Sequence, residues 1–422
     1  MAMSKNSKKL FVMFLFTAMF LLVYRIGSRV QMPFVNSDAI TSSTKDLFGF
    51  LDVFSGQALS NFSILALGIS PYITASIVVQ LLQMDILPVL KEWSEEGPTG
   101  KQKLNQLTKY IALGLAFVQA LTLTLGLPDY FANGFVDSPM TYVYLALVAT
   151  AGTSFCMWLA EKMTAKGIGN GTSMLIVAGI LASYPAMIGD LGYSYLASGS
   201  AKGIFTFIAV ILVLILIIVG IVFMEAAQRK IPIQYANRPA AASLRGKSDS
   251  NVPIKLNSAS VIPVIFAATL MSIPTTIIQI TGNTTSGIGG VIYSIFSQTE
   301  TIGFVLYIVL IFVFSFFYSF LQMNPEKMAE NLQKNNAYIP GVRPGEDTAA
   351  FISRVLFKVT MIGATYLAIV AALPIIITKI FNLSSSIQVG GTGLIIVVGV
   401  AIETAKQIKT QGQEKQYRGF IN

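Results

Sequence analysis

The 422-residue sequence contains no histidine, one cysteine, and few charged residues, which make up 12% of the chain. The absence of histidine excludes histidine-based catalysis and argues against a metal site. The lone thiol, Cys156, cannot form an internal disulfide and is interpreted as a small buried hydrophobic residue. A soluble protein would carry about twice this charged fraction. Because 54% of the residues are hydrophobic, we predict a polytopic membrane protein.

Ten stretches are long and apolar enough to cross a bilayer, which takes about 20 mostly apolar residues. The first follows Lys5, Lys8 and Lys9, and no small-residue cleavage site comes after it, so we expect a retained span rather than a signal peptide. An all-α membrane fold is therefore predicted. The ten spans lie near residues 10–30, 66–86, 109–127, 141–160, 172–190, 203–224, 259–280, 301–322, 356–378 and 388–405.

The positions of Lys and Arg predict the orientation of these spans, because basic residues gather on cytoplasmic segments. With the N-terminus placed inside, 24 of the 29 Lys and Arg residues lie on cytoplasmic segments. The outer segments hold Lys45, Lys202 and Lys379, while Arg25 and Arg29 lie at the outer end of the first span and fit the rule poorly. Both termini are thus predicted to be cytoplasmic.

The two halves of the chain, residues 1–190 and 191–422, repeat two features. Each second span opens with a proline between two isoleucines, Pro71 in Ile69–Ile73 and Pro263 in Ile262–Ile265, and each fifth span opens in a glycine-rich stretch. Five spans per half is an odd number, so the halves must have opposite orientations. Such an inverted repeat is typical of transport proteins and places function between the halves. Chance placement of Gly and Pro is the alternative, since both are common in membrane helices.

Ionisable residues are missing from the middles of spans two to ten, where ion-binding or acid-binding transporters usually place them. A narrow ring of aliphatic side chains can instead close a pathway by excluding water. Ile69 and Ile73 are four residues apart and can face one axis, although ordinary helix packing would give the same spacing. Pro71 favours a helix start at this point, and a broken helix is tolerated where it lines a cavity.

Three segments between the spans are unusual. Residues 46–60 are apolar but too short to span, so we expect a re-entrant segment or an interfacial helix. The cytoplasmic segments 225–256 and 324–354 are basic and too long for simple turns. They suit an anionic partner, either nucleic acid or an acidic protein face, although charges that only set the topology are the alternative.

The sequence resembles the SecY family, the central subunits of the bacterial protein-conducting channel, over nearly all ten spans. Several independent motifs in the same order carry the resemblance. These motifs are Asn61–Ser76, Lys166–Gly171, Glu225–Lys230, Val261–Phe266, Asn324–Glu326, Gly341–Glu346 and Gly390–Thr392.

The resemblance implies an hourglass pore between two inverted five-helix halves, closed at its waist by a ring of side chains. The ring positions are Ile69, Ile73, Thr172, Ile176, Ile265 and Ile396. Thr172 departs from the aliphatic pattern but keeps a similar branched shape. Residues 46–60 are implied to form a plug in the outer funnel, with the apolar side chains of Phe48, Phe50, Leu51, Val53, Phe54 and Leu59.

The same resemblance makes spans two and three, and spans seven and eight, the two sides of a lateral gate, which Gln80 would face. Arg229, Lys230 and Arg343 would dock the SecA motor and the ribosome. SecE and SecG would be small membrane partners, and an unfolded polypeptide would be the substrate. No catalytic residue, cofactor or metal is implied, and the expected location is the bacterial cytoplasmic membrane.

Three alternatives remain open at this point. The chain could be an accessory paralogue that serves a restricted set of exported proteins. It could be an inverted-repeat secondary transporter, which needs a charged or cation-coordinating site in the middle of the membrane. It could also be a membrane scaffold or chaperone, which would keep the basic loops but would not need a ring or a plug.

Overall fold

The computed structural model describes the chain except residues 1–4, 36–51, 53–54, 84–86, 127–138, 197–200, 236–249, 281–286, 299, 382–384 and 414–422. Each of the ten predicted spans coincides with a helix. These helices are α1 (Lys5–Gly27), α3 (Ser70–Leu82), α5 (Pro98–Gly126), α6 (Pro139–Lys166), α7 (Gly171–Leu196), α8 (Ala201–Ala226), α10 (Ile262–Ile280), α12 (Thr301–Met323), α14 (Glu346–Phe381) and α15 (Ser385–Gln413).

Within the described residues, seven helices are long and apolar enough to cross a membrane. The second predicted span, 66–86, is shorter than expected, because α3 begins at Ser70 and ends at Leu82. Its 13 residues reach about 20 Å, which is less than a bilayer core. The first turn contains Pro71, as the sequence predicted.

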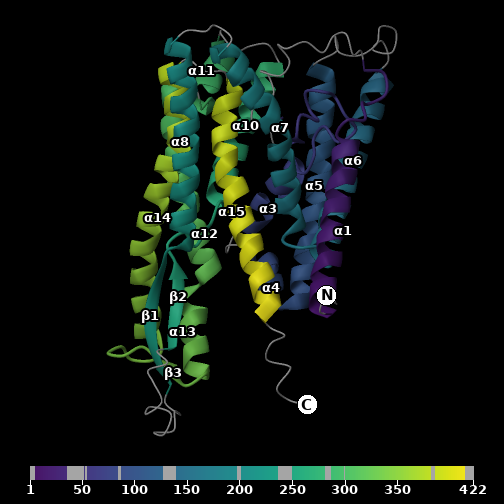
Figure 1. The fold of residues 1–422 in the computed structure, drawn as a ribbon. Coiled ribbons are helices and arrows are strands. Elements are labelled where there is room, and N and C mark those ends of the chain that lie inside the picture. Colours follow the sequence, from purple (N-terminus) through teal and green to yellow (C-terminus); the bar gives the residue numbers. More distant parts are fainter. Residues whose placement is uncertain are drawn as a thin grey trace.

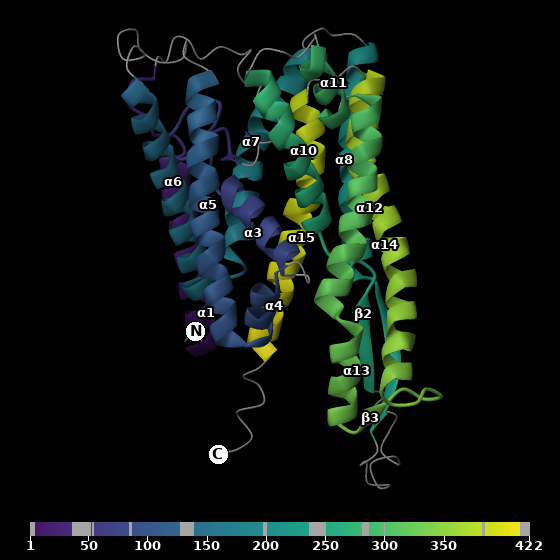
Figure 2. The ribbon, with the colours of Figure 1, turned by 180° about the vertical axis from the view of Figure 1, so that it is seen from behind.

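The helices form two groups that stand side by side. Helices α1, α5 and α6 lie on one side and α8, α12 and α14 on the other, with α3, α7, α10 and α15 between them (Figures 1 and 2). Helix α1 begins and α15 ends at the same end of the molecule, which also carries the small β-sheet (Figure 1). An even number of spans requires that the first helix begins and the last helix ends at the same end, as α1 and α15 do.

Residues 55–69 run through the interior in a series of turns before α3 begins. Leu59, Phe62 and Ala66 are buried there against residues of α5 and α6, including Leu145. The described part of the 46–60 segment is therefore inside the protein, as a re-entrant segment would be, and does not lie as a helix on the surface. Irregular backbone at this depth is tolerated because protein surrounds it.

The two long basic segments contain a sheet that the sequence analysis did not predict. Strand β1 (Gln228–Tyr235) pairs antiparallel with β2 (Ser250–Lys255) and with β3 (Ala337–Tyr338), so that the sheet order is β2-β1-β3. Ile231 and Ile233 alternate with exposed residues, which is the period of a half-buried strand. The all-α prediction therefore holds for the membrane part alone.

The sheet packs on the end of α14 that projects beyond the membrane helices. Ile231, Ile233 and Ile254 of the sheet form one buried cluster with Ile352 and Leu356 of α14. Helix α13 (Pro325–Lys334) lies beside them and begins at Asn324, whose side chain accepts a hydrogen bond from the Lys327 amide. We call this body, residues 228–235, 250–255 and 325–359, the platform. Two short helices, α4 (Pro88–Glu95) and α11 (Gly287–Phe296), complete the fold.

Glycine lets α6 approach the turns before α3 very closely. A Cβ atom at Gly152 would lie 2.0 Å from the Ile64 carbonyl oxygen, which belongs to the backbone and cannot rotate away. Gly114 of α5, in contrast, has open space where its Cβ would be.

We therefore expect Gly152→Ala to destabilise the protein by about 1–3 kcal/mol, the typical cost of overpacking a core. Gly114→Ala is the matched control and should be neutral or slightly stabilising. The temperature at which half of the purified protein stops eluting as a single species in detergent measures the effect. Equal temperatures for the two variants would contradict the close packing.

Candidate functional site

Five of the six predicted ring residues lie in one buried cluster. Ile69, Ile73, Ile176, Ile265 and Ile396 are between 1% and 8% exposed, and all belong to the largest apolar cluster of the molecule. They come from α3 with its N-terminus and α7 in the first half of the chain, and from α10 and α15 in the second half, so that both halves contribute. The structure thus brings these isoleucines into one dry, apolar region.

The start of α3 aligns its two isoleucines. Ile69 is the N-cap residue, and the Ile73 amide donates to the Ile69 carbonyl oxygen at 3.2 Å, which sets the two side chains one turn apart on the same face. Ile265 has the same place in α10, where its amide donates to the Val261 carbonyl oxygen at 3.2 Å. Each proline-containing helix start therefore presents an isoleucine within its first turn.

Glycines on either side of Ile396 bring α15 against its neighbours. A Cβ atom at Gly393 would lie 2.8 Å from Cγ2 of Ile180 on α7, and one at Gly399 would lie 2.5 Å from Cγ1 of Val261 at the start of α10. Both glycines are three residues from Ile396, so they share its helix face. Their small size lets Ile396 lie between the two groups of helices.

Thr172 is the sixth predicted ring residue and the one polar side chain among the six. It is half-buried at the start of α7, where its amide donates to Oδ1 of Asn170 at 3.0 Å. Together with Ile69 it lines a cavity of about 390 Å³, whose wall also includes Tyr72 and Glu161. Glu161 forms an ion pair with Lys109 of α5. Thr172 thus lies at a polar cavity that adjoins the isoleucines.

Most of the predicted plug side chains, namely Phe48, Phe50, Leu51, Val53 and Phe54, lie outside the described residues. Leu59 is described and is 2% exposed, but it packs between α5 and α6 in a second cluster, not with the ring isoleucines. The neighbouring Gly56 lies against α7, where its Cβ position would be 3.0 Å from the Gly179 Cα. The segment is therefore held one turn beyond Ile176.

Gln80 connects the two sides of the predicted lateral gate. Its Oε1 accepts a hydrogen bond from the hydroxyl of Tyr318 on α12, and its Nε2 donates to Oγ of Ser76 at 3.0 Å. The Tyr318 ring packs edge-to-face on Phe266 of α10 at 4.9 Å. Gln80 thus has a polar partner on a neighbouring helix, and its place at a lateral gate stays a prediction. Tyr318 was not predicted, because a tyrosine in an apolar helix gives no signal of a polar partner in the sequence.

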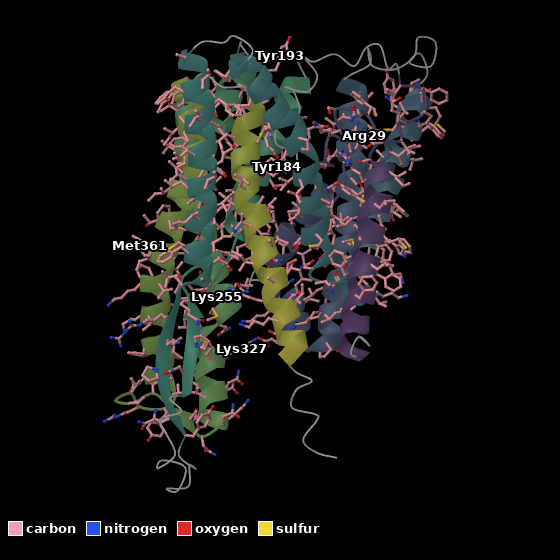
Figure 3. The ribbon with its side chains drawn as sticks, in the orientation of Figure 1. Arg29, Tyr184, Tyr193, Lys255, Lys327 and Met361 are labelled. Atoms are coloured by element: carbon pink, nitrogen blue, oxygen red, sulfur yellow. The ribbon has the colours of Figure 1, made fainter. Side chains whose placement is uncertain are left out.

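The three predicted docking residues are exposed on the platform. Arg229 and Lys230 lie on β1, opposite Ile254 and Pro253 of β2, and Arg343 lies in the turn between β3 and α14. The Arg343 carbonyl oxygen accepts a hydrogen bond of 2.7 Å from Thr348, which ties this turn to α14. Figure 3 shows Lys255 and Lys327 at the same end of the molecule and Tyr193 at the opposite end. The two basic segments thus form one cationic body.

Comparisons with known proteins agree with this arrangement. A family described as SecY matches residues 63–405. The protein translocase subunit SecY of Halalkalibacterium halodurans is 47% identical over 414 residues, covering 96% of each chain. The protein translocase subunit SecY of Bacillus subtilis is 43% identical over 415 residues, covering 96% of this chain and 95% of the relative.

Solved structures share the fold at lower identity. One, described as "The structure of a protein conducting channel", has a TM-score of 0.68 at 20% identity and covers 98% of this chain and 95% of its own. Another, Sec61 in a canine ribosome-channel complex from the endoplasmic reticulum, has a TM-score of 0.67 at 19% identity with the same coverage. Since the family match and the near-complete relatives agree, this chain belongs to the SecY family.

Proposed function

We propose that this chain is the central subunit of a protein-conducting channel, which passes unfolded polypeptides across the membrane and releases membrane helices sideways into it. Family membership and the ten-helix fold support this function, and the chain is a channel subunit rather than an enzyme. The two halves, residues 1–190 and 191–422, would form the two walls of the pore.

The observation that carries the proposal is that five isoleucines from both halves of the chain lie in one buried apolar cluster. An apolar constriction excludes water and ions because neither is stabilised inside it. Aliphatic side chains can also move apart around a threading chain without leaving an unpaired polar group behind. A ring of isoleucine therefore suits a pore that must accept many sequences and still stay sealed.

The lateral gate would lie between α3 and α5 on one side and α10 and α12 on the other. These helices are in contact in the structure, and Gln80 and Tyr318 form a side-chain hydrogen bond between the two sides. Side-chain hydrogen bonds between membrane helices contribute little, about 0.6 kcal/mol on average. The gate would thus be closed weakly enough for an apolar segment to open it.

The platform would receive the partner that supplies the driving force. Its exposed Arg229, Lys230 and Arg343 can bind carboxylate or phosphate groups, and Arg does so in a bidentate manner. Relatives of this fold have been solved on ribosomes, as the canine complex was. The SecA motor and the ribosome would bind here, with SecE and SecG as small membrane subunits. Both termini and the platform would face the cytoplasm, and the membrane would be the bacterial cytoplasmic membrane.

The ring is tested by replacing Ile73, Ile176 and Ile265 together with Asn. Polar side chains would hydrate the constriction, so that ion conductance of the idle channel in planar bilayers should rise at least severalfold. Ile188, which is exposed near the outer end of α7, offers a control, Ile188→Asn. Unchanged conductance in the triple variant would count against the ring.

The gate is tested with Gln80→Leu and Tyr318→Phe. Loss of the hydrogen bond should favour the open gate by about 2-fold to 10-fold, so precursors with a shortened apolar signal should be exported more efficiently. Ser76→Ala is the matched control, because it removes only the bond within α3. Export of such precursors into proteoliposomes is the measurement, and equal export by all variants would refute the role of this pair.

For the platform, we expect Arg343→Glu to abolish motor-driven export while the protein remains folded in the membrane. Reversed charge would repel an acidic partner surface instead of binding it. Lys379→Glu makes the same change of charge at the last turn of α14, near its other end, and should leave export intact. Normal export by the Arg343 variant would disprove the docking role.

A further inference from the structure

Arg25 breaks the rule that basic residues gather on cytoplasmic segments, and the structure supplies a reason. Its Nη1 donates a hydrogen bond of 2.9 Å to the Gly56 carbonyl oxygen. The adjacent Tyr24 hydroxyl donates to the Ser55 carbonyl oxygen at 3.1 Å, in a buried contact. Two neighbouring side chains near the end of α1 thus bind two consecutive carbonyl groups of the segment that precedes α3.

This segment is a compact unit that makes most of its hydrogen bonds internally. The Gln57 amide donates to the Asp52 carbonyl oxygen at 2.9 Å, and the Ser60 amide donates to the Asp52 carboxylate at 2.8 Å. Oγ of Ser55 donates to the Asp52 carbonyl oxygen at 3.0 Å and accepts from the Leu59 amide at 3.2 Å. The turn can therefore move as one body without losing these bonds.

The two ends of the turn are held differently. Its C-terminal side continues into a short bridge, in which the Met32 amide donates to the Phe62 carbonyl oxygen at 2.8 Å and the Ile64 amide donates to the Val30 carbonyl oxygen at 2.9 Å. Gly56 lies at the other side, with a φ of +68°, pressed against Gly179 of α7. Gly179 is one turn beyond Ile176, so this side of the turn contacts α7 next to the isoleucine cluster.

We propose that Tyr24 and Arg25 are positioning residues that hold Asp52 and residues 55–60 over the closed pore. Outward movement of the turn breaks their two hydrogen bonds, while the internal bonds and the bridge at residues 30–32 and 62–64 remain. The bridge then serves as the hinge. Arg25 supplies a bond from a charged donor, which is stronger than a neutral one. The inference rests on the proposed channel function and adds the contact that keeps the idle channel shut.

The test measures how often the turn leaves its position. A single thiol is introduced as Ala58→Cys, at a residue that is 0% exposed, after the only native thiol has been removed by Cys156→Ala. Labelling by a membrane-impermeant maleimide added from the outer side then reports opening. Arg25→Met should raise the labelling rate at least about tenfold, and Tyr24→Phe should raise it less. Arg29→Met is the control, since Arg29 is an exposed arginine four residues away (Figure 3), and should leave the rate unchanged.

Arg25→Lys keeps the charge but replaces the guanidinium fork, so its rate should be intermediate. It also provides a readout if Arg25→Met does not yield folded protein. Equal labelling of the Arg25→Lys, Tyr24→Phe and Arg29→Met channels would overturn the inference. The ring variants test the channel function separately. If they raise ion conductance, the proposed channel function stands even where the role of Tyr24 and Arg25 is refuted.

Discussion

Inside a bilayer, a polypeptide must satisfy its own backbone hydrogen bonds, and this constraint decides where the chain can depart from helix. Ten helices meet the requirement locally. In the first half of the chain, the described residues 55–69 depart from helix. Their backbone groups form hydrogen bonds within turns and with donors from α1. Helices α1, α5, α6 and α7 surround this segment. The close approach of α6 to this segment is possible because Gly152 has no side chain.

The same constraint explains how an apolar seal and a polar gate can coexist. The five isoleucine side chains contain no group that needs a hydrogen-bond partner, so they can part and meet again without cost in hydrogen bonds. Gln80 and Tyr318 do need partners, and each supplies the other's. Opening the proposed gate would therefore require new partners for both groups, whereas opening the proposed ring would require only that apolar contacts be exchanged for contacts with the passing chain.

The sequence predicts the fold well where the signal is local. Length and hydropathy find every span, and Pro71 marks the start of α3. The β-sheet was not predicted, because its strands are far apart in the sequence. Strand β1 pairs with β2 across 14 intervening residues and with β3 about 100 residues later. The alternation of Ile231 and Ile233 was nevertheless a usable signal. Likewise, only packing shows that Leu59 lies in a cluster with α5 and α6 and not with the isoleucines. The partner of Arg25 could not be predicted, but its anomalous charge could have prompted the search.

Helix α14 has 36 residues and is about 54 Å long, far more than the bilayer core of about 30 Å. Its inner end is fixed to the sheet through Ile352 and Leu356, and its membrane part contacts α8, α12 and α15. A rod clamped at one end and embedded at the other behaves as a lever. A tilt of the sheet would thus be transmitted along α14 to the helices that it contacts, more than about 30 Å away.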